Sequence, residues 1–339
     1  MIKKIKEEFY FNAMFLLTVL TGVILIYSTY AWFSASLNVI ISDFNMTTRS
    51  TDGLFISLDG VTWSSSVSIT ENDILNRLTD TYPNHETQWS KELGPVSTIG
   101  IPDANNNRFK FFTHGPHRVI RPKYDNTDTL NFFEIEESGV RDDQLFVAFD
   151  VFFKNVTPSP FEDNIYIEEA VFVNADDEND DDTAVNALRL GMVFSDVTSL
   201  GATHSTIQNL GCNGRCRDFI YEPNAFNHSE KSINMASKHG VLLEHGNFYE
   251  TYGMKKGGDD IMIWSGVKND KVAINNEFYE LQNNITSTGQ SVFAMPEGIV
   301  KARIYVWVEG QDVDIIEYTS PGYQVSVSLK FNKDHNSLN

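Results

Sequence analysis

Regular alternation of apolar and polar residues dominates the chain after its N-terminal segment. The clearest case runs from Tyr323 to Phe331, where apolar residues hold every second position and polar residues hold the rest. A second case runs from Val300 to Val308 and stops at Gly310. A period of two residues is typical of β-strands with one buried face. We therefore expect two strands here, and because they are neighbours in the sequence we expect them to pair.

Other segments predict further strands and one minor helix. Residues Leu145 to Phe153 are apolar on both faces apart from Asp150, as expected for a central strand that is covered on both sides. Residues Glu71 to Thr79 fit a short helix that Thr70 can cap. The remaining predicted strands are Leu54 to Leu58, Arg108 to Phe112, Ile165 to Val173, Leu188 to Phe194 and Ile261 to Trp264.

The order of these segments indicates an all-β protein. Long polar loops between short strands fit a jelly-roll-like antiparallel β-sandwich. Residues from about 203 to 258 are rich in Gly, Asn, His and Lys and show little alternation, so we expect a long loop insertion there. We assign residues 32–339 to the β-sandwich domain and residues 1–31 to a separate N-terminal element.

The N-terminal element is defined by a stretch without charge. No Asp, Glu, Lys, Arg or His occurs between Phe9 and Ser42. Residues 11–30 supply the roughly 20 apolar residues that a membrane-spanning helix needs, and the lysines before them favour export of the chain after this segment. Thr29 and Ala31 also form the small-residue pattern of a signal-peptidase site. The segment is thus an apolar helix that is either a cleaved signal peptide or a retained transmembrane anchor, and the rest is extracellular or on the cell surface.

The residues after this element predict a strand rather than a linker. Leu37, Val39 and Ile41 alternate with polar residues, so Ser36 to Phe44 should form a strand at the start of the exported chain. Such a strand can complete its own sheet or pair with the sheet edge of a neighbouring subunit. In the second case, Leu37, Val39, Ile41 and Phe44 would carry the contact between subunits.

Composition narrows the partners of the exported chain. The protein has 339 residues and a formal net charge of −20, which disfavours binding to nucleic acid. Its two cysteines, Cys212 and Cys216, are too few for a zinc site by themselves. An oxidising exterior makes a disulfide between them the expected state, although a redox-active pair is the alternative.

One loop is strongly acidic. Residues 176–182 contain six carboxylates, among them Asp176, Asp177, Asp180 and Asp182. Hard oxygen ligands on a loop suit Ca²⁺, although the spacing is not that of an EF-hand. The pattern is equally typical of a solvated, self-repelling loop. Calcium is the one cofactor that the sequence suggests.

Signatures of enzymes are weak. His114 and His117 are separated by Gly and Pro, and no third metal ligand is indicated. Residues 257–260, Gly-Gly-Asp-Asp, look like the metal-binding turn of cyclic-dinucleotide synthases or of polymerases over four residues only, and a plain turn is the simpler interpretation. No nucleophile elbow, zinc helix or phosphate-binding loop occurs. We therefore expect a protein that is not an enzyme.

The two ends of the chain resemble a known family. The lysine-led apolar segment, Ala31-Trp32-Phe33-Ser34, the short strand and Gly53-Leu54-Phe55-Ile56-Ser57 look like the N-terminus of the TasA and camelysin family of bacterial biofilm-matrix and cell-surface proteins. The end of one strand at Gly310-Gln311-Asp312 and the closing strand Tyr323 to Phe331 are similar too. The resemblance implies a jelly-roll-like sandwich whose N-terminal strand is donated to the next subunit. Partners would then be copies of the chain or related surface proteins.

An alternative function uses aromatic residues. A membrane-anchored β-sandwich ectodomain could bind a glycan or protein ligand through Trp63, Trp89 or Trp264. Buried tryptophans are the competing interpretation of the same residues. The membrane would be a partner through residues 1–31, either before cleavage or permanently.

Overall fold

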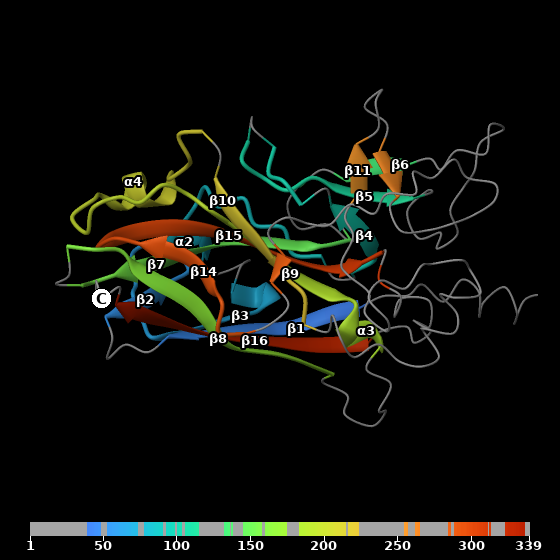
Figure 1. The fold of residues 1–339 in the computed structure, drawn as a ribbon, viewed down its shortest axis with the longest axis horizontal. Helices are drawn as coiled ribbons and strands as arrows, with labels where there is room; N and C mark the ends of the chain where they lie inside the picture. Colours follow the sequence, from blue (N-terminus) through green and yellow to red (C-terminus); the bar gives the residue numbers. More distant parts are fainter. Residues whose placement is uncertain are drawn as a thin grey trace, which may run out of the picture. The chain divides into compact units, whose positions relative to one another are not determined.

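The computed structural model confirms an all-β protein, in which strands form two main sheets (Figure 1). Its described helices and strands lie within the compact unit Asn38–Asn339. The structure describes residues 39–48, 53–73, 78–90, 93–98, 100–103, 106–114, 132–135, 137, 145–157, 160–174, 183–214, 216–223, 254–256, 262–264, 284–285, 288–310, 312 and 323–335.

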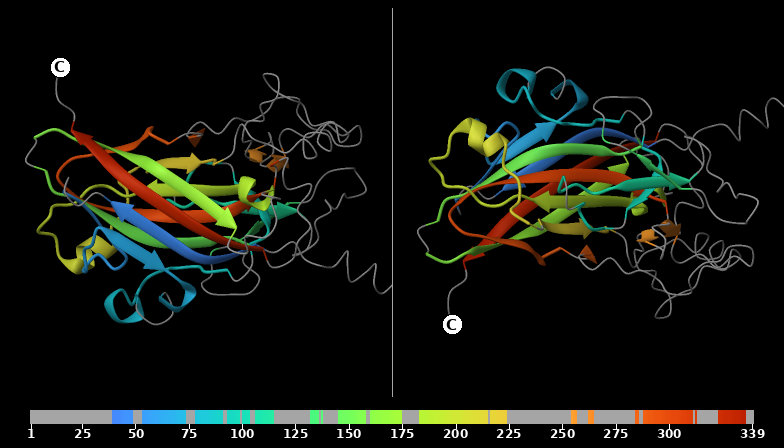
Figure 2. Two further views of the ribbon diagram at one scale, coloured as in Figure 1. Left: turned by 90° about the horizontal axis from the view of Figure 1, so that it is seen from below. Right: turned by 90° about the horizontal axis from the view of Figure 1, so that it is seen from above.

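The first sheet contains the first and the last strands of the described chain. Its order is β14 (Ser291–Met295), β8 (Asp163–Asn174), β16 (Tyr323–His335), β1 (Val39–Thr48) and β3 (Ser66–Ile69). Figure 2 shows blue β1 beside dark red β16. The inward residues of β16, from Val325 to Phe331, are completely buried at every second position, as the alternation predicted.

The second sheet is built around β15 (Gly298–Glu309). This strand pairs antiparallel with β7 (Val147–Asn155) on one side and with β9 (Leu188–Phe194) on the other. On the far side of β7 lies β2 (Leu54–Ser57), which pairs with β7. On the far side of β9 lies β10 (Arg217–Tyr221), and β10 pairs in turn with β13 (Asn284–Ile285).

The remaining described elements are three strands that extend the second sheet, a separate strand pair and three short helices. The end of β15 pairs with β4 (Pro95–Thr98), which leads to β5 (Phe111–His114) and β6 (Phe132–Ile135). A small separate pair is formed by β11 (Met254–Lys256) and β12 (Met262–Trp264). The described helices are short: α2 (Leu78–Thr81), α3 (Thr183–Asn186) and α4 (His204–Gln208).

Strand β7 is buried on both faces because it has a layer on each side. Phe149 faces the first sheet and meets Phe44 of β1, with 5.0 Å between ring centroids. Phe146, on the opposite face, stacks on Phe111 of β5 at 4.2 Å. This is the central strand that the run from Leu145 to Phe153 predicted.

One predicted pairing is wrong. Strands β15 and β16 do not pair; each lies in a different sheet, and β16 takes β8 and β1 as its partners. The physical reason is that both faces and both edges of β15 are already covered by β7, β9 and the layer containing β5. Adjacency in the sequence therefore did not decide pairing.

The region expected to be a loop insertion begins with regular structure. Helix α4 opens it, and β10 adds to the second sheet beside β9, which the sequence did not predict. Residues 224–253 lie outside the described residues. The predicted helix at Glu71 to Thr79 is described only in part, with helical turns at residues 71–73 and from Leu78 onward.

Candidate functional site

The candidate site is β1 together with the strands that receive it. β1 pairs in parallel with β16 from Val39 opposite Tyr323 to Thr48 opposite Phe331. On its other side, β3 pairs antiparallel with β1 only between Phe44 and Thr47. The first strand of the described chain thus fills an interior position of the sheet, next to the last strand.

A bulge sets which residues of β1 face inward. The pairing register shifts between Ile41 and Asp43, so Ser42 is the additional residue. Ile41 before the bulge and Phe44 and Met46 after it are all at most 3% exposed. The apolar residues of β1 change from odd-numbered to even-numbered positions at Ser42. The bulge there keeps both groups on the inward face of the sheet.

Polar contacts hold the bulge in place on the outer side of the sheet. Ser326 of β16 donates its hydroxyl to the Asp43 carboxylate at 3.0 Å, and Ser42 donates to the same carboxylate at 2.9 Å. Ser42 Oγ also lies 3.3 Å from the carbonyl oxygen of Val325. These contacts give β1 a specific register on β16 in addition to its apolar burial.

The C-terminal end of β1 is tied to the second sheet. Thr48 donates its hydroxyl to the Leu54 carbonyl at 2.8 Å, and its backbone N–H bonds to the Ser65 carbonyl. Gly53, which begins the return into β2, has a φ of +79°. A Cβ atom there would lie 2.3 Å from the carbonyl oxygen of Val156, so a glycine is required at this position.

The predicted assembly residues are described only in part. Ile41 and Phe44 are buried inside the chain's own sandwich, and Val39 lies in β1. Leu37 lies outside the described residues. The sequence left open whether this strand pairs in its own sheet or in the sheet of a neighbouring subunit. In the single chain, it lies in its own sheet.

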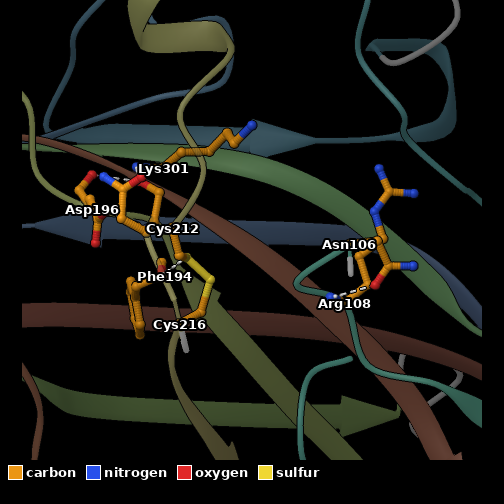
Figure 3. The surroundings of a disulfide bond; sticks show 9 residues. Asn106, Arg108, Phe194, Asp196, Cys212, Cys216 and Lys301 are labelled. Atoms are coloured by element: carbon orange, nitrogen blue, oxygen red, sulfur yellow. Dashed lines mark hydrogen bonds between the residues drawn. A yellow bond between two sulfur atoms is a disulfide. The ribbon is translucent and has the colours of Figure 1, made fainter. Parts of the chain in front are cut away.

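The two cysteines form the predicted disulfide (Figure 3). Cys212 and Cys216 lie in the segment between α4 and β10, with Cα atoms 5.4 Å apart. Cys216 packs into the apolar cluster on the outer face of the second sheet, and the segment is held by Asp196, whose carboxylate accepts the Asn213 backbone N–H at 2.7 Å. The disulfide closes a short loop just before β10, and Cys212 Sγ lies 3.2 Å from the Phe194 carbonyl oxygen at the end of β9.

A buried charged network lies on the outer face of the second sheet. Arg303 of β15 donates to Asp150 of β7 at 2.9 Å and to Glu137 at 2.6 Å, and Tyr82 donates to Asp150 at 2.8 Å. Burial raises the pKa of Asp150, but the positive charges of Arg303 and Lys301 outweigh it and hold that pKa below its usual value. For Tyr82, burial and the neighbouring carboxylate raise the pKa of the hydroxyl.

This network resembles a structural ion-pair cluster more than an acid–base pair. Burial lowers the pKa of Arg303, but the charges of Glu137 and Asp150 raise it well above its ordinary value, so the guanidinium stays charged between them. A carboxylate held ionised by an arginine is a poor general acid at neutral pH. The network ties α2, β7, β15 and the end of β6 together.

Other predicted sites fall in different places. Asp176, Asp177, Asp180 and Asp182, the suggested calcium ligands, lie outside the described residues, as do His117 and residues 257–260. Within the described ranges, no three His, Cys, Asp or Glu side chains gather as a metal site would require.

The aromatic residues of the alternative function do not form one surface. Trp89 is 2% exposed and packs near Phe149, so it is a core residue and not a ligand contact. Trp63 is half-buried beneath the Lys154 ammonium, 4.6 Å from the ring centroid. The side chain of Trp264 is not among those described.

Residues 1–38, which include the predicted apolar helix, lie outside the described residues. In the part of the chain that is described, no helix has the length and apolar character needed to cross a membrane.

Comparisons with protein-family models, with curated proteins and with solved structures find no match to this chain.

Proposed function

We propose that the protein is an extracellular structural protein, a subunit of a cell-surface or biofilm-matrix fibre that assembles by exchange of its N-terminal strand. In this proposal the fold is jelly-roll-like, residues 1–31 direct export, and the partner is another copy of the chain or a related surface protein. The function requires no catalytic residue.

The observation that carries the proposal is the position of β1. It begins the described chain, yet it lies between β16 and β3, whose sequence positions are far apart. Withdrawal of β1 would leave unpaired backbone along β16 and expose the apolar interior that Ile41, Phe44 and Met46 cover. A strand of the same sequence from a second copy is complementary to that opening in shape, register and hydrogen bonding.

Magnitudes favour a stable contact. Full burial of an apolar side chain of this size contributes roughly 1.5–3 kcal/mol. The three buried side chains and the backbone hydrogen bonds to β16 together make β1 important for the stability of the fold. Exchange between copies replaces one set of contacts by an identical set, so polymerisation depends on the local concentration of chains and on the segment before Val39.

The proposal is tested by removing the strand and restoring it. Deletion of residues 32–48 from the exported protein should abolish fibres in electron micrographs. A synthetic peptide of residues 39–48 should bind the truncated protein and restore its thermal transition without restoring fibres, since a free peptide cannot link subunits. A peptide with Phe44→Asp is the matched control and should not bind. Fibres that persist unchanged after the deletion would refute strand exchange.

The alternative of an anchored ligand-binding ectodomain receives less support from the described residues. Of its three tryptophans, Trp89 is buried and Trp63 is covered by Lys154. N-terminal sequencing of protein from cells distinguishes the two functions, because a start at Trp32 is incompatible with a retained anchor.

A further inference from the structure

Three buried polar side chains meet at one end of the core, between the two sheets. The cluster is buried: Lys333 on β16 is 5% exposed, and Asp163 on β8 and Asn155 on β7 are fully buried. Each continues the inward face of its strand, two positions from a fully buried apolar residue: Phe331, Ile165 and Phe153 respectively. A lysine at such a position is unusual, because its charge leaves water on folding.

The three side chains are in direct contact with one another. Lys333 Nζ donates to Asn155 Oδ1 at 2.7 Å and to Asp163 Oδ2 at 2.9 Å. Asn155 Nδ2 donates to the same Asp163 oxygen at 2.9 Å and to the Met295 carbonyl at 3.1 Å. One carboxylate oxygen thus bridges the lysine amine and the amide nitrogen of the asparagine.

Backbone carbonyl groups and aromatic residues surround the cluster, and Lys333 Nζ also lies 3.4 Å from the Val156 carbonyl oxygen. Phe153 and Phe331 pack edge to face with 5.1 Å between ring centroids, and both are fully buried. Removal of both charges from water opposes their attraction in such a medium. Transfer of one proton from Lys333 to Asp163 converts the pair into a neutral amine, which is the nucleophilic form of lysine.

The geometry also places the amine beside a carbonyl carbon. A C=O bond is only about 1.2 Å long, so the Asn155 Cγ atom lies one bond beyond the oxygen that Lys333 Nζ contacts. Fixing a nucleophile and a carbonyl at contact distance can replace a large part of the activation barrier of a bimolecular reaction.

From this arrangement we propose that Lys333 and Asn155 form an intramolecular isopeptide bond, with Asp163 as the proton-transfer group. The bond would join β16 of the first sheet to β7 of the second. It would modify the core covalently, and it does not rest on strand exchange.

The reaction balances without any further reagent. Asp163 takes a proton from the Lys333 ammonium, and the amine lone pair forms a bond to Asn155 Cγ while the C=O π electrons move to Oδ1. Asp163 protonates Oδ1, accepts the surplus proton of the lysine nitrogen and delivers it to Nδ2. The C–Nδ2 bond then breaks, ammonia leaves with that electron pair, the C=O bond forms again, and Asp163 takes the proton of Oδ1. The products are a secondary amide, a neutral Asp163 and ammonia.

The bond would fix the strand against which β1 lies. Lys333 is on β16, the parallel partner of β1, so a crosslink to β7 would prevent β16 from leaving the sandwich under tension. A chain exported to a surface would gain resistance to pulling and to proteases from a bond of this kind.

Mass spectrometry of the reduced full-length chain tests the proposal. The folded protein should weigh about 17 Da less than its sequence mass, because one ammonia is lost when the lysine amine acylates. Trypsin should fail to cleave after Lys333, and a single branched peptide should contain both Lys333 and Asn155. Fragmentation spectra then place the linkage at these two side chains.

Variants separate the proposed chemistry from simple packing. Lys333→Arg and Asp163→Asn should each restore the full mass. Lys330→Arg is the matched control, since Lys330 lies on the same strand but pairs with Glu168 near the surface, and this variant should keep the mass loss. A wild-type chain of full mass, with a free Lys333 amine and an Asn155 side chain that is intact or merely deamidated, would overturn the proposal without reference to any variant.

Discussion

Phe44 of the first strand and Phe149 of the opposite sheet pack edge to face across the core, with ring centroids 5.0 Å apart and an interplanar angle of 75°. Both rings are almost inaccessible to solvent. The contact shows that β1 contributes to the centre of the molecule and not to its margin. It is therefore a sensitive probe of what β1 contributes to stability.

Replacement Phe44→Ala should lower the free energy of unfolding by about 3–5 kcal/mol, the usual cost of truncating a buried phenylalanine. Chemical denaturation followed by tryptophan fluorescence measures the change. Ser68→Ala is the control, because Ser68 is exposed on β3 opposite Asn45, and it should change stability by no more than about 0.5 kcal/mol. Equal effects of the two substitutions would mean that β1 is not packed as described.

Gly53 should be intolerant of a side chain. Its φ of +79° and its approach to the Val156 carbonyl oxygen predict that Gly53→Ala destabilises the protein by about 2 kcal/mol or more. Gly201→Ala is the comparison, because the space around Gly201 is open. Thermal unfolding of the two variants should differ by several degrees, and coincident transitions would contradict the backbone conformation described for Gly53.

Asp150 should make folding stability depend on acidity. The charges of Arg303 and Lys301 outweigh burial and hold the pKa of Asp150 below its ordinary value of 3.8 in the folded state. A lowered pKa means that the stabilising contribution is fully present above pH about 4 and is lost as the pH falls through the folded pKa. The free energy of unfolding should therefore fall on acidification in this range.

The variant Asp150→Asn should show a weaker loss of stability on acidification than the wild type, measured by denaturant titration between pH 6 and pH 2, about the range in which a carboxylate titrates. Tyr82→Phe is the control, because it removes one hydrogen bond to Asp150 but leaves the Arg303 charge in place. If Asp150→Asn and the wild type lose stability in parallel, Asp150 is not held ionised by Arg303.

The strands that could be predicted are those with long and regular patterns. The alternation of β16, the two-sided apolar run of β7 and the bounds of β9 all agree with the structure. Strands β3 and β4 were missed because each has four residues of which at most two are apolar, whereas β2, which is equally short, was predicted because three of its four residues are apolar.

Pairing and the buried polar groups were harder to predict for a physical reason. A sequence pattern shows which residues of a strand turn inward, but not which strand lies opposite, so β15 and β16 were paired wrongly. The same limit hid the cluster of Lys333, Asn155 and Asp163, whose members come from three strands. The available signal was Lys333 itself, a charged residue at the next inward position after Phe331.

Strand exchange would place β1 of one subunit against β16 of another in the fibre. Asn45 and Ser328 are opposite each other on the outer face of this pair, so cysteines at the two positions lie within reach of a disulfide. Subunits carrying only Asn45→Cys should be mixed with subunits carrying only Ser328→Cys, assembled, oxidised and separated by size under denaturing conditions. We predict a disulfide-linked dimer of the two different variants, present in fibres and absent when either variant is assembled alone. Fibres without that dimer, formed while the double variant closes the same bond within one chain, would contradict strand exchange.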